Sequence, residues 1–266
     1  MDYPVNRFLR RARCNAYEQR FYRDWVAEEA LWRFEIKVKE SDLLILCDRD
    51  LRSLAEQVLK KNRSDIERYA SAHPDFFSAL APLPISADAP AIVQQMGFAA
   101  QCWDVGPMAA VAGAVASAVG EALVRECQTV IVENGGDIFA QAPRPLTFAI
   151  YAGEGSPFAD KICFHCEAHA GLGVCTSSAT VGPSLSFGAA DAVVAIAGDA
   201  AMADAAATAL ANQIKRPGDV DWVVAEQSRK AELNGLIAIC GDRFGAFGSM
   251  EFQRRKTNGR NKRDNR

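Results

Sequence analysis

Hydrophobic and polar residues alternate along residues 31–39 with the period of a half-buried strand. The polar residues 40–42 interrupt this alternation, and the apolar run 43–46 follows them. Together these segments predict a β-hairpin near the beginning of the chain. Across residues 48–72 the apolar positions recur about every 3.6 residues with charged residues between them, which predicts an amphipathic helix.

Small residues dominate two later segments that also predict helices. Residues 106–123 are mostly Gly, Ala and Val, and Pro107 suits a first helical turn because its missing N–H would have no partner there. Residues 200–215 have a similar composition. A helix with so little side-chain surface either packs closely on a sheet or leaves its backbone open to a ligand, and close packing is the safer interpretation.

Short apolar segments separate the predicted helices and are interpreted as strands. In chain order they are residues 130–132, 138–140, 146–151, 161–166, 173–176, 191–197 and 235–240, with 244–252 as a further extension of the sheet. Additional helices are predicted at residues 91–103 and 225–233. Several helices combined with short, antiparallel strands predict an α+β fold.

The formal net charge of −3 divides unevenly along the chain. Residues 254–266 contain seven Lys or Arg and one Asp, a charge of +6, so residues 1–253 carry −9. The strongly basic body of a nucleic-acid-binding protein is therefore absent. We expect a basic N-terminal arm at residues 1–24, a main domain at residues 25–253 and a disordered basic tail at residues 254–266. The arm either packs across the domain or contacts nucleic acid, and its few basic residues favour packing.

Composition and cysteine usage predict a cytoplasmic protein with no membrane partner. No stretch approaches the ~20 apolar residues that span a bilayer, and the beginning lacks the apolar segment of a secretory signal. The eight cysteines have no disulfide-framework spacing, so we expect reduced thiols. Cys163, His165, Cys166, His169 and Cys175 form a candidate zinc cluster, but their spacing differs from that of a zinc finger.

Residues 133–138 read Glu-Asn-Gly-Gly-Asp-Ile and lie between two apolar runs. Gly135 and Gly136 can adopt backbone angles that are closed to other residues, and they let a ligand approach the main chain. Asn134 and Asp137 place polar groups on either side of this bend. The motif predicts either a ligand-binding turn or a plain β-hairpin, because Gly-Gly and Gly-Asp are also ordinary turn pairs.

Two further motifs carry oxygen ligands. Asp204 and Thr208 are four positions apart in a predicted helix, so they share one face and offer hard oxygens to Mg²⁺ or Ca²⁺. The alternative is that Asp204 caps the helix and Thr208 packs. Thr176, Ser177 and Ser178 follow a predicted strand, where their hydroxyls and amides either hold phosphate oxygens or form a solvated loop.

The three motifs, in this order, resemble the ApbE-like superfamily, whose best-known members are FAD:protein FMN transferases. Residues 106–113, 176–178 and 184–192 resemble more closely uncharacterised protein family 0280, a cytoplasmic branch of that superfamily. The resemblance covers roughly residues 15–250. It implies an α+β, ApbE-like fold of two sheet-and-helix halves with a ligand cleft between them.

The resemblance also implies a cofactor site for FAD or FMN with Mg²⁺. The residues that would bind the flavin nucleotide are Asn134, Gly135, Gly136, Asp137, Thr176, Ser177 and Ser178. The residues that would hold Mg²⁺ are Asp204 and Thr208. The implied partners are a flavin or related nucleotide and an acceptor protein, and self-association is left open.

Two parts of the transferase pattern are absent from this chain. Residues 181–187 contain no histidine where the transferases carry a His-Ile-x-Asp-Pro segment, and the Lys-Gly before the Gly-Gly turn is missing. Retained nucleotide binding with altered or lost flavin transfer is therefore the more economical interpretation. Two alternatives stay open: a non-catalytic binding or assembly factor, and a sulfur-assimilation protein that uses cysteine chemistry.

Overall fold

The computed structural model describes residues 31–159, 162–181 and 186–254. The arm predicted at residues 1–24 and almost all of the tail predicted at residues 254–266 lie outside this part of the chain. Within it, no single helix is long and apolar enough to cross a bilayer, and the segments Ala91–Trp103 and Pro107–Leu123 meet that test only as a pair bent by 105°.

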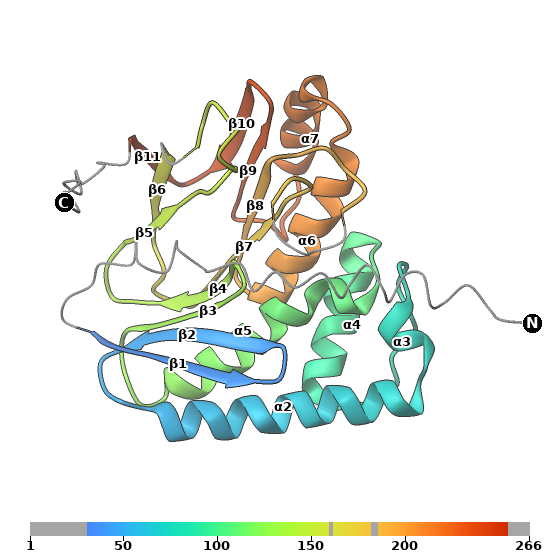
Figure 1. The fold of residues 1–266 in the computed structure, drawn as a ribbon, viewed down its shortest axis with the longest axis vertical. Coiled ribbons are helices and arrows are strands. Elements are labelled where there is room, and N and C mark those ends of the chain that lie inside the picture. The colour runs from blue at the N-terminus through green and yellow to red at the C-terminus, as the bar shows by residue number, and fades with distance from the viewer. Residues whose placement is uncertain (1–30, 160–161, 182–185, 255–266) are drawn as a thin grey trace, which may run out of the picture.

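The frame of the fold is an eight-stranded sheet in the order β1-β2-β3-β4-β7-β8-β9-β10 (Figure 1). Its strands are β1 Trp32–Val38, β2 Ser41–Cys47, β3 Val130–Asn134, β4 Asp137–Gln141, β7 Leu172–Ser177, β8 Ala192–Ala197, β9 Gly235–Cys240 and β10 Arg243–Gly248. Neighbouring strands of this sheet are antiparallel. A second sheet has the order β11-β6-β5 and consists of β5 Leu146–Ala149, β6 Ile162–Cys166 and β11 Glu251–Arg254.

Helices cover one side of the large sheet. They are α2 Arg52–Ala72, α3 Asp75–Ser78, α4 Ala91–Trp103, α5 Val111–Leu123, α6 Ala200–Gln213 and α7 Val220–Gln227, with 3₁₀ turns η2 Pro107–Ala110 and η3 Pro217–Asp219. Helix α5 contacts β3 and β4, while α6 contacts β7 and β8 (Figure 1). The two small-residue helices therefore lie close against the sheet, which confirms the packing interpretation of their sequences.

Two hydrophobic cores lie on opposite faces of the large sheet. In β8, Val193 and Ala195 belong to the core shared with the helices, whereas Val194 and Ile196 belong to the core shared with the small sheet. Because β8 is buried on both faces, its sequence is apolar throughout instead of alternating. The α+β class is confirmed, and the β4–β7 pairing joins both parts of the large sheet into one continuous sheet.

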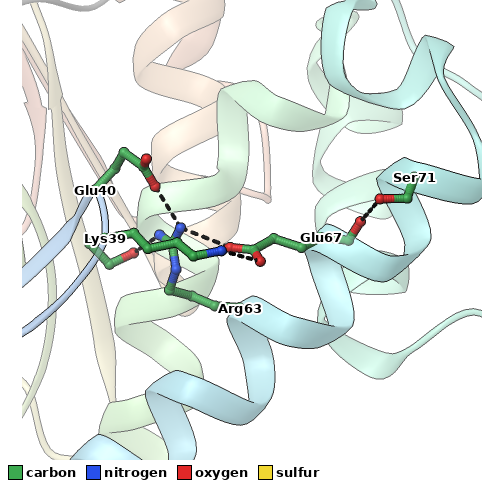
Figure 2. Close-up of polar contacts among 6 residues, drawn as sticks. Lys39, Glu40, Arg63, Glu67 and Ser71 are labelled. Carbon is green, nitrogen blue, oxygen red and sulfur yellow. Dashed lines mark hydrogen bonds and ion pairs between the residues drawn. The ribbon is translucent and has the colours of Figure 1, made fainter.

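The predicted hairpin of β1 and β2 is confirmed, and charged side chains tie its turn to α2 (Figure 2). Arg63 of α2 donates to Ser41 Oγ and to a carboxylate oxygen of Glu40, each at 2.6 Å. Arg63 also contacts Glu67 at 3.0 Å, and Lys39 pairs with Glu67 at 2.6 Å. This network joins the hairpin to the helix that lies across it.

Two predicted helices differ from the observed ones. Residues 106–123 form η2 and then α5 instead of a single helix. The break falls between Ala110 and Val111, and in the first turn of α5 the Gly113 N–H donates to a carboxylate oxygen of Asp204. The helix predicted at residues 225–233 is α7, which starts earlier because its buried residues follow helical spacing from Val220 onward.

Candidate functional site

The Gly-Gly motif forms the turn between β3 and β4. Gly135 and Gly136 have φ values of 74° and 107°, which favour glycine, and they connect the paired residues Asn134 and Asp137. Glu133 stabilises the turn, because its Oε1 accepts the N–H of Gly136 at 2.9 Å. The motif is therefore a β-hairpin turn, and its role in ligand binding stays a prediction. Its polar side chains contact the neighbouring elements.

Asp204 of α6 lies at the beginning of α5. Its Oδ2 accepts the Gly113 N–H at 2.9 Å, and the backbone of Ala112 also hydrogen-bonds to this carboxylate. The residue before α5, Ala110, provides no side-chain cap, so the first N–H groups of the helix need acceptors from elsewhere. Asp204 therefore caps α5 from a neighbouring helix. A Cβ on Gly113 would lie 2.1 Å from the Ala200 carbonyl oxygen, so this close approach requires glycine.

The Gly-Gly hairpin reaches the same peptide from the other side. Asn134 Nδ2 donates to the carbonyl oxygen of Ala112 at 3.1 Å. The peptide between Ala112 and Gly113 thus contacts Asn134 through its oxygen and Asp204 through its N–H. Asp137, at the far side of the turn, accepts the backbone N–H of Thr176 at 3.3 Å. The three sequence motifs are therefore brought together around the start of α5.

Two carboxyl groups, those of Asp137 and Asp204, lie close together at this junction. Burial and the nearby carboxylate of Asp137 raise the pKa of Asp204 well above its usual range, although the backbone N–H groups of α5 oppose the shift. Burial and both carboxylates also raise the pKa of the Cys175 thiol. That thiol is fully buried and donates to the Ala200 carbonyl oxygen at 3.2 Å. Two buried carboxylates of like charge are stabilised when a proton or a cation lies between them.

The residues of the hydroxyl motif, Thr176, Ser177 and Ser178, make different contacts. Ser177 and Ser178 are buried. The Ser178 Oγ accepts the N–H groups of Thr180 at 3.1 Å and Val181 at 2.9 Å, so this hydroxyl closes the turn that follows β7. Thr176 joins the junction through its backbone N–H. Of the three residues, Ser178 therefore stabilises the local turn through its side chain.

Thr208 lies one helical turn beyond Asp204 and is half-buried. Both residues therefore belong to one face of α6, as their spacing predicted. Among the described residues, no three His, Cys, Asp or Glu side chains are grouped so as to hold a metal ion, and this includes the histidines and cysteines of β6. A cation at Asp204 would consequently depend on hydroxyl, backbone and ligand oxygens for the rest of its coordination.

The capping alternative for Asp204 within its own helix is wrong, because Asp199 is the N-cap of α6. An oxygen of Asp199 accepts the Ala201 N–H at 2.9 Å, and its carboxylate also accepts Gln95 Nε2 at 3.0 Å and Ser117 Oγ at 3.1 Å. The N-cap role of Asp199 was not predicted from the sequence. The signal was present, since an Asp immediately before a helical segment is a strong N-cap candidate.

Comparison with known proteins gives the family. A family model described as "AbpE bacteria" matches residues 23–233. The chain is 37% identical over 225 residues to UPF0280 protein MJ1526 of Methanocaldococcus jannaschii, covering 81% of this chain and 90% of that protein. It is 40% identical over 221 residues to a UPF0280 protein of Methanosphaerula palustris, covering 82% of this chain and 91% of that protein.

Solved structures give the same fold at much lower identity. Flavin Transferase ApbE from Vibrio cholerae matches with a TM-score of 0.53 and 11% identity, covering 82% of this chain and 97% of that one. The apo form of Pseudomonas stutzeri flavinyl transferase ApbE matches with a TM-score of 0.51 and 13% identity, covering 82% and 93%. The solved structures show the fold, and the family model and the sequence relatives show the family. This chain belongs to the UPF0280 family of ApbE-like proteins.

Proposed function

We propose that this protein binds a flavin nucleotide, FAD or FMN, together with Mg²⁺ where its three motifs meet. The observation that carries the proposal is the pair of contacts at one peptide: Asn134 bonds to its oxygen at 3.1 Å, and Asp204 bonds to its N–H at 2.9 Å. These contacts bring the Gly-Gly turn to the face of α6 that carries Asp204 and Thr208. The fold is that of flavin transferases, which makes a flavin-related function the natural expectation.

The residues present fit Mg²⁺ with a phosphate-bearing ligand. Asp204 and Thr208 offer a carboxylate and a hydroxyl oxygen, and Asp137 adds negative charge nearby. Mg²⁺ is usually held by one or two carboxylates together with water and substrate phosphates, so a sparse protein site is sufficient. When bound, the ion would neutralise the charge of the nucleotide diphosphate.

The remaining site residues would bind and orient the nucleotide. A Cβ on Gly136 would meet nothing within 4 Å, so its backbone faces open space that a ligand can approach. Asn134 and Asp137 stand on either side of that turn, and Thr176 and Ser177 follow on β7. Backbone amides and hydroxyls of this kind are suited to phosphate and ribityl oxygens.

Binding without transfer is the second candidate function. Residues 181–187 carry no histidine in the interval where the transferases have one, so the chain lacks that acid–base group. Sulfur chemistry has less support at Cys166 and Cys175. Burial raises the pKa of Cys166 to about 11, and it raises that of Cys175 as well, whereas a catalytic cysteine that reacts rapidly at neutral pH has a lowered pKa. We also propose that the protein works in the cytoplasm, since the spacing of its eight cysteines is not that of a disulfide framework.

Calorimetric titration with FAD, with and without Mg²⁺, tests the proposal. We expect Mg²⁺ to tighten FAD binding by the wild type, and we expect Asp204→Asn to lose that effect while keeping its fold. Asp219→Asn is the matched control, because Asp219 also accepts backbone N–H groups but lies on η3, away from the three motifs. Equal Mg²⁺ dependence in wild type and Asp204→Asn would remove the metal role of Asp204, and no FAD binding by the wild type would end the proposal.

Transfer is tested separately. The protein, FAD and Mg²⁺ are incubated with acceptor peptides that together offer every nucleophilic side chain, and the peptide masses are measured. Addition of FMN would establish an enzyme, whereas tight FAD binding with no modified peptide would favour the binding function.

A further inference from the structure

Cys47 and Cys127 lie together at the edge of the helical layer, outside the site described above. Cys47 is the last residue of β2 and is fully buried, whereas Cys127 is half-buried in the connection between α5 and β3. The side chains of Cys47 and Cys127 lie close enough for each thiol to affect the pKa of the other. The two sulfurs are therefore neighbours although they are 80 positions apart in the chain.

Asp48 holds the two segments in this arrangement. Its Oδ2 accepts the N–H groups of Gln128 at 2.6 Å and Thr129 at 2.8 Å. The β2–β3 ladder, in which Cys47 pairs with Val130, fixes the same register. The two hydrogen bonds of Asp48 thus hold the chain just after Cys127 against the residue that follows Cys47, independently of the thiols themselves.

We infer that Cys47 and Cys127 are a site of reversible disulfide formation when the folded protein meets a hydroperoxide. Both are free thiols in the structure, with Cys47 Sγ 2.9 Å from the Arg49 carbonyl oxygen and Cys127 Sγ 3.3 Å from that of Leu123. To form the bond, both sulfurs must leave these carbonyl oxygens. A disulfide requires such proximity between the two side chains.

The chemistry balances with one hydroperoxide. The more accessible sulfur, that of Cys127, loses its proton and attacks the peroxide, so that an S–O bond forms, the O–O bond breaks and water or an alcohol leaves. The sulfur of Cys47 then loses its proton and attacks the Cys127 sulfenic acid, forming the S–S bond while the S–O bond breaks and water leaves. The two thiols lose two electrons and two protons, and the peroxide is reduced.

The reaction is expected to be slow at neutral pH. Burial raises the pKa of Cys47 to about 11 and also raises that of Cys127, so few thiolates are present. The pair therefore stays reduced in ordinary conditions and responds to sustained oxidant. Once formed, the bond would close a loop that contains α2, α4 and α5, which restricts the unfolded chain and raises the melting temperature.

The test uses the full-length folded protein and hydrogen peroxide. After treatment in native buffer the free thiols are alkylated, the protein is digested, and the peptides joining residues 47 and 127 are sought by mass spectrometry. We expect this cross-link, together with a melting temperature that rises by several degrees and returns on reduction. Cys127→Ser should lose both effects. Cys102→Ser should keep them, because Cys102 is a half-buried thiol on α4 outside the pair.

Two outcomes would overturn the inference. The first is oxidation of Cys127 to sulfinic acid in the folded wild type without any cross-link to Cys47. The second is a cross-link that appears only after the protein has been denatured. Because mass spectrometry is done on the wild type, neither outcome depends on whether the serine variants fold.

Discussion

The backbone N–H of Gly113 lies 2.9 Å from Oδ2 of Asp204, although the two residues are 91 positions apart. This hydrogen bond joins the start of α5 to α6, and it fixes the carboxylate that we assign to the metal. The geometry of the candidate site and the stability of the helix pair therefore depend on the same contact. Substitutions at either end should separate these two roles.

Gly113→Ala should destabilise the fold. Its Cβ would lie 2.1 Å from the Ala200 carbonyl oxygen and 2.8 Å from the Asp204 Cβ, and neither neighbour is the free end of a flexible side chain. Overpacking of this kind costs about 1–3 kcal/mol or more. Urea denaturation measures the loss. Gly198→Ala is the control, since a Cβ there would meet nothing within 4 Å; equal losses in both variants would contradict the close approach.

Asp204→Asn and Asp204→Ala should differ in the absence of divalent ions. Asparagine keeps an oxygen to accept the Gly113 N–H and removes the charge that burial and Asp137 disfavour, so its stability should equal or exceed that of the wild type. Alanine leaves the N–H without its partner, at a cost of about 1–3 kcal/mol. Denaturation in the presence of a chelator measures the order. A destabilised Asp204→Asn would mean that the charge itself supports the fold.

Asp199→Ala should weaken the start of α6. The variant loses the cap of the Ala201 N–H and leaves Gln95 and Ser117 without their shared acceptor. The loss of an N-cap alone costs about 0.5–2 kcal/mol. Asp199→Asn should retain most of the stability because asparagine caps equally well. Thermal melts of the three proteins compare these effects, and similar losses for both substitutions would assign the stability to charge instead of capping.

Much of the fold was readable from hydrophobic periodicity. Helix α4, Ala91–Trp103, was predicted with its observed bounds, and the fully apolar β8 was recognised as a strand. Local burial determines the spacing of apolar residues in these elements, so the sequence pattern predicts them. Helix α7 was misplaced because the buried residues that define its face begin at Val220, before the segment that was considered.

The site could be predicted only in part. The three motifs were found as separate stretches, and the i to i+4 spacing of Asp204 and Thr208 gave their common face. Their convergence on the peptide between Ala112 and Gly113 depends on strand order and on close helix packing, which no local pattern encodes. Asp199 is the N-cap of α6, whereas Asp204 accepts a hydrogen bond from Gly113 of α5. The roles proposed for these residues in cofactor binding stay predictions.

Glu67→Gln should make the protein less sensitive to acid. Hydrogen bonds from Lys39 at 2.6 Å and from Arg63 at 3.0 Å hold the pKa of Glu67 below its usual value of 4.5 (Figure 2). A carboxyl whose pKa is lowered on folding stabilises the protein fully above its unfolded pKa. That contribution is lost as the pH falls through the lower, folded value. The variant should therefore be less stable than the wild type at neutral pH, and the difference should vanish in acid.

The expected difference at neutral pH is about 0.2–1 kcal/mol, because the pair of Lys39 and Glu67 is exposed and screened by solvent. Urea denaturation from neutral pH down to about pH 3 measures it. Glu56→Gln is the matched control, since Glu56 pairs with Lys60 within α2 and has no ion pair to a second element in the described part of the chain. Glu67 should show the larger effect because it also anchors the β1–β2 turn through Lys39 and Arg63. An equal pH dependence for the two variants would mean that the network in Figure 2 adds nothing to an ordinary helical ion pair.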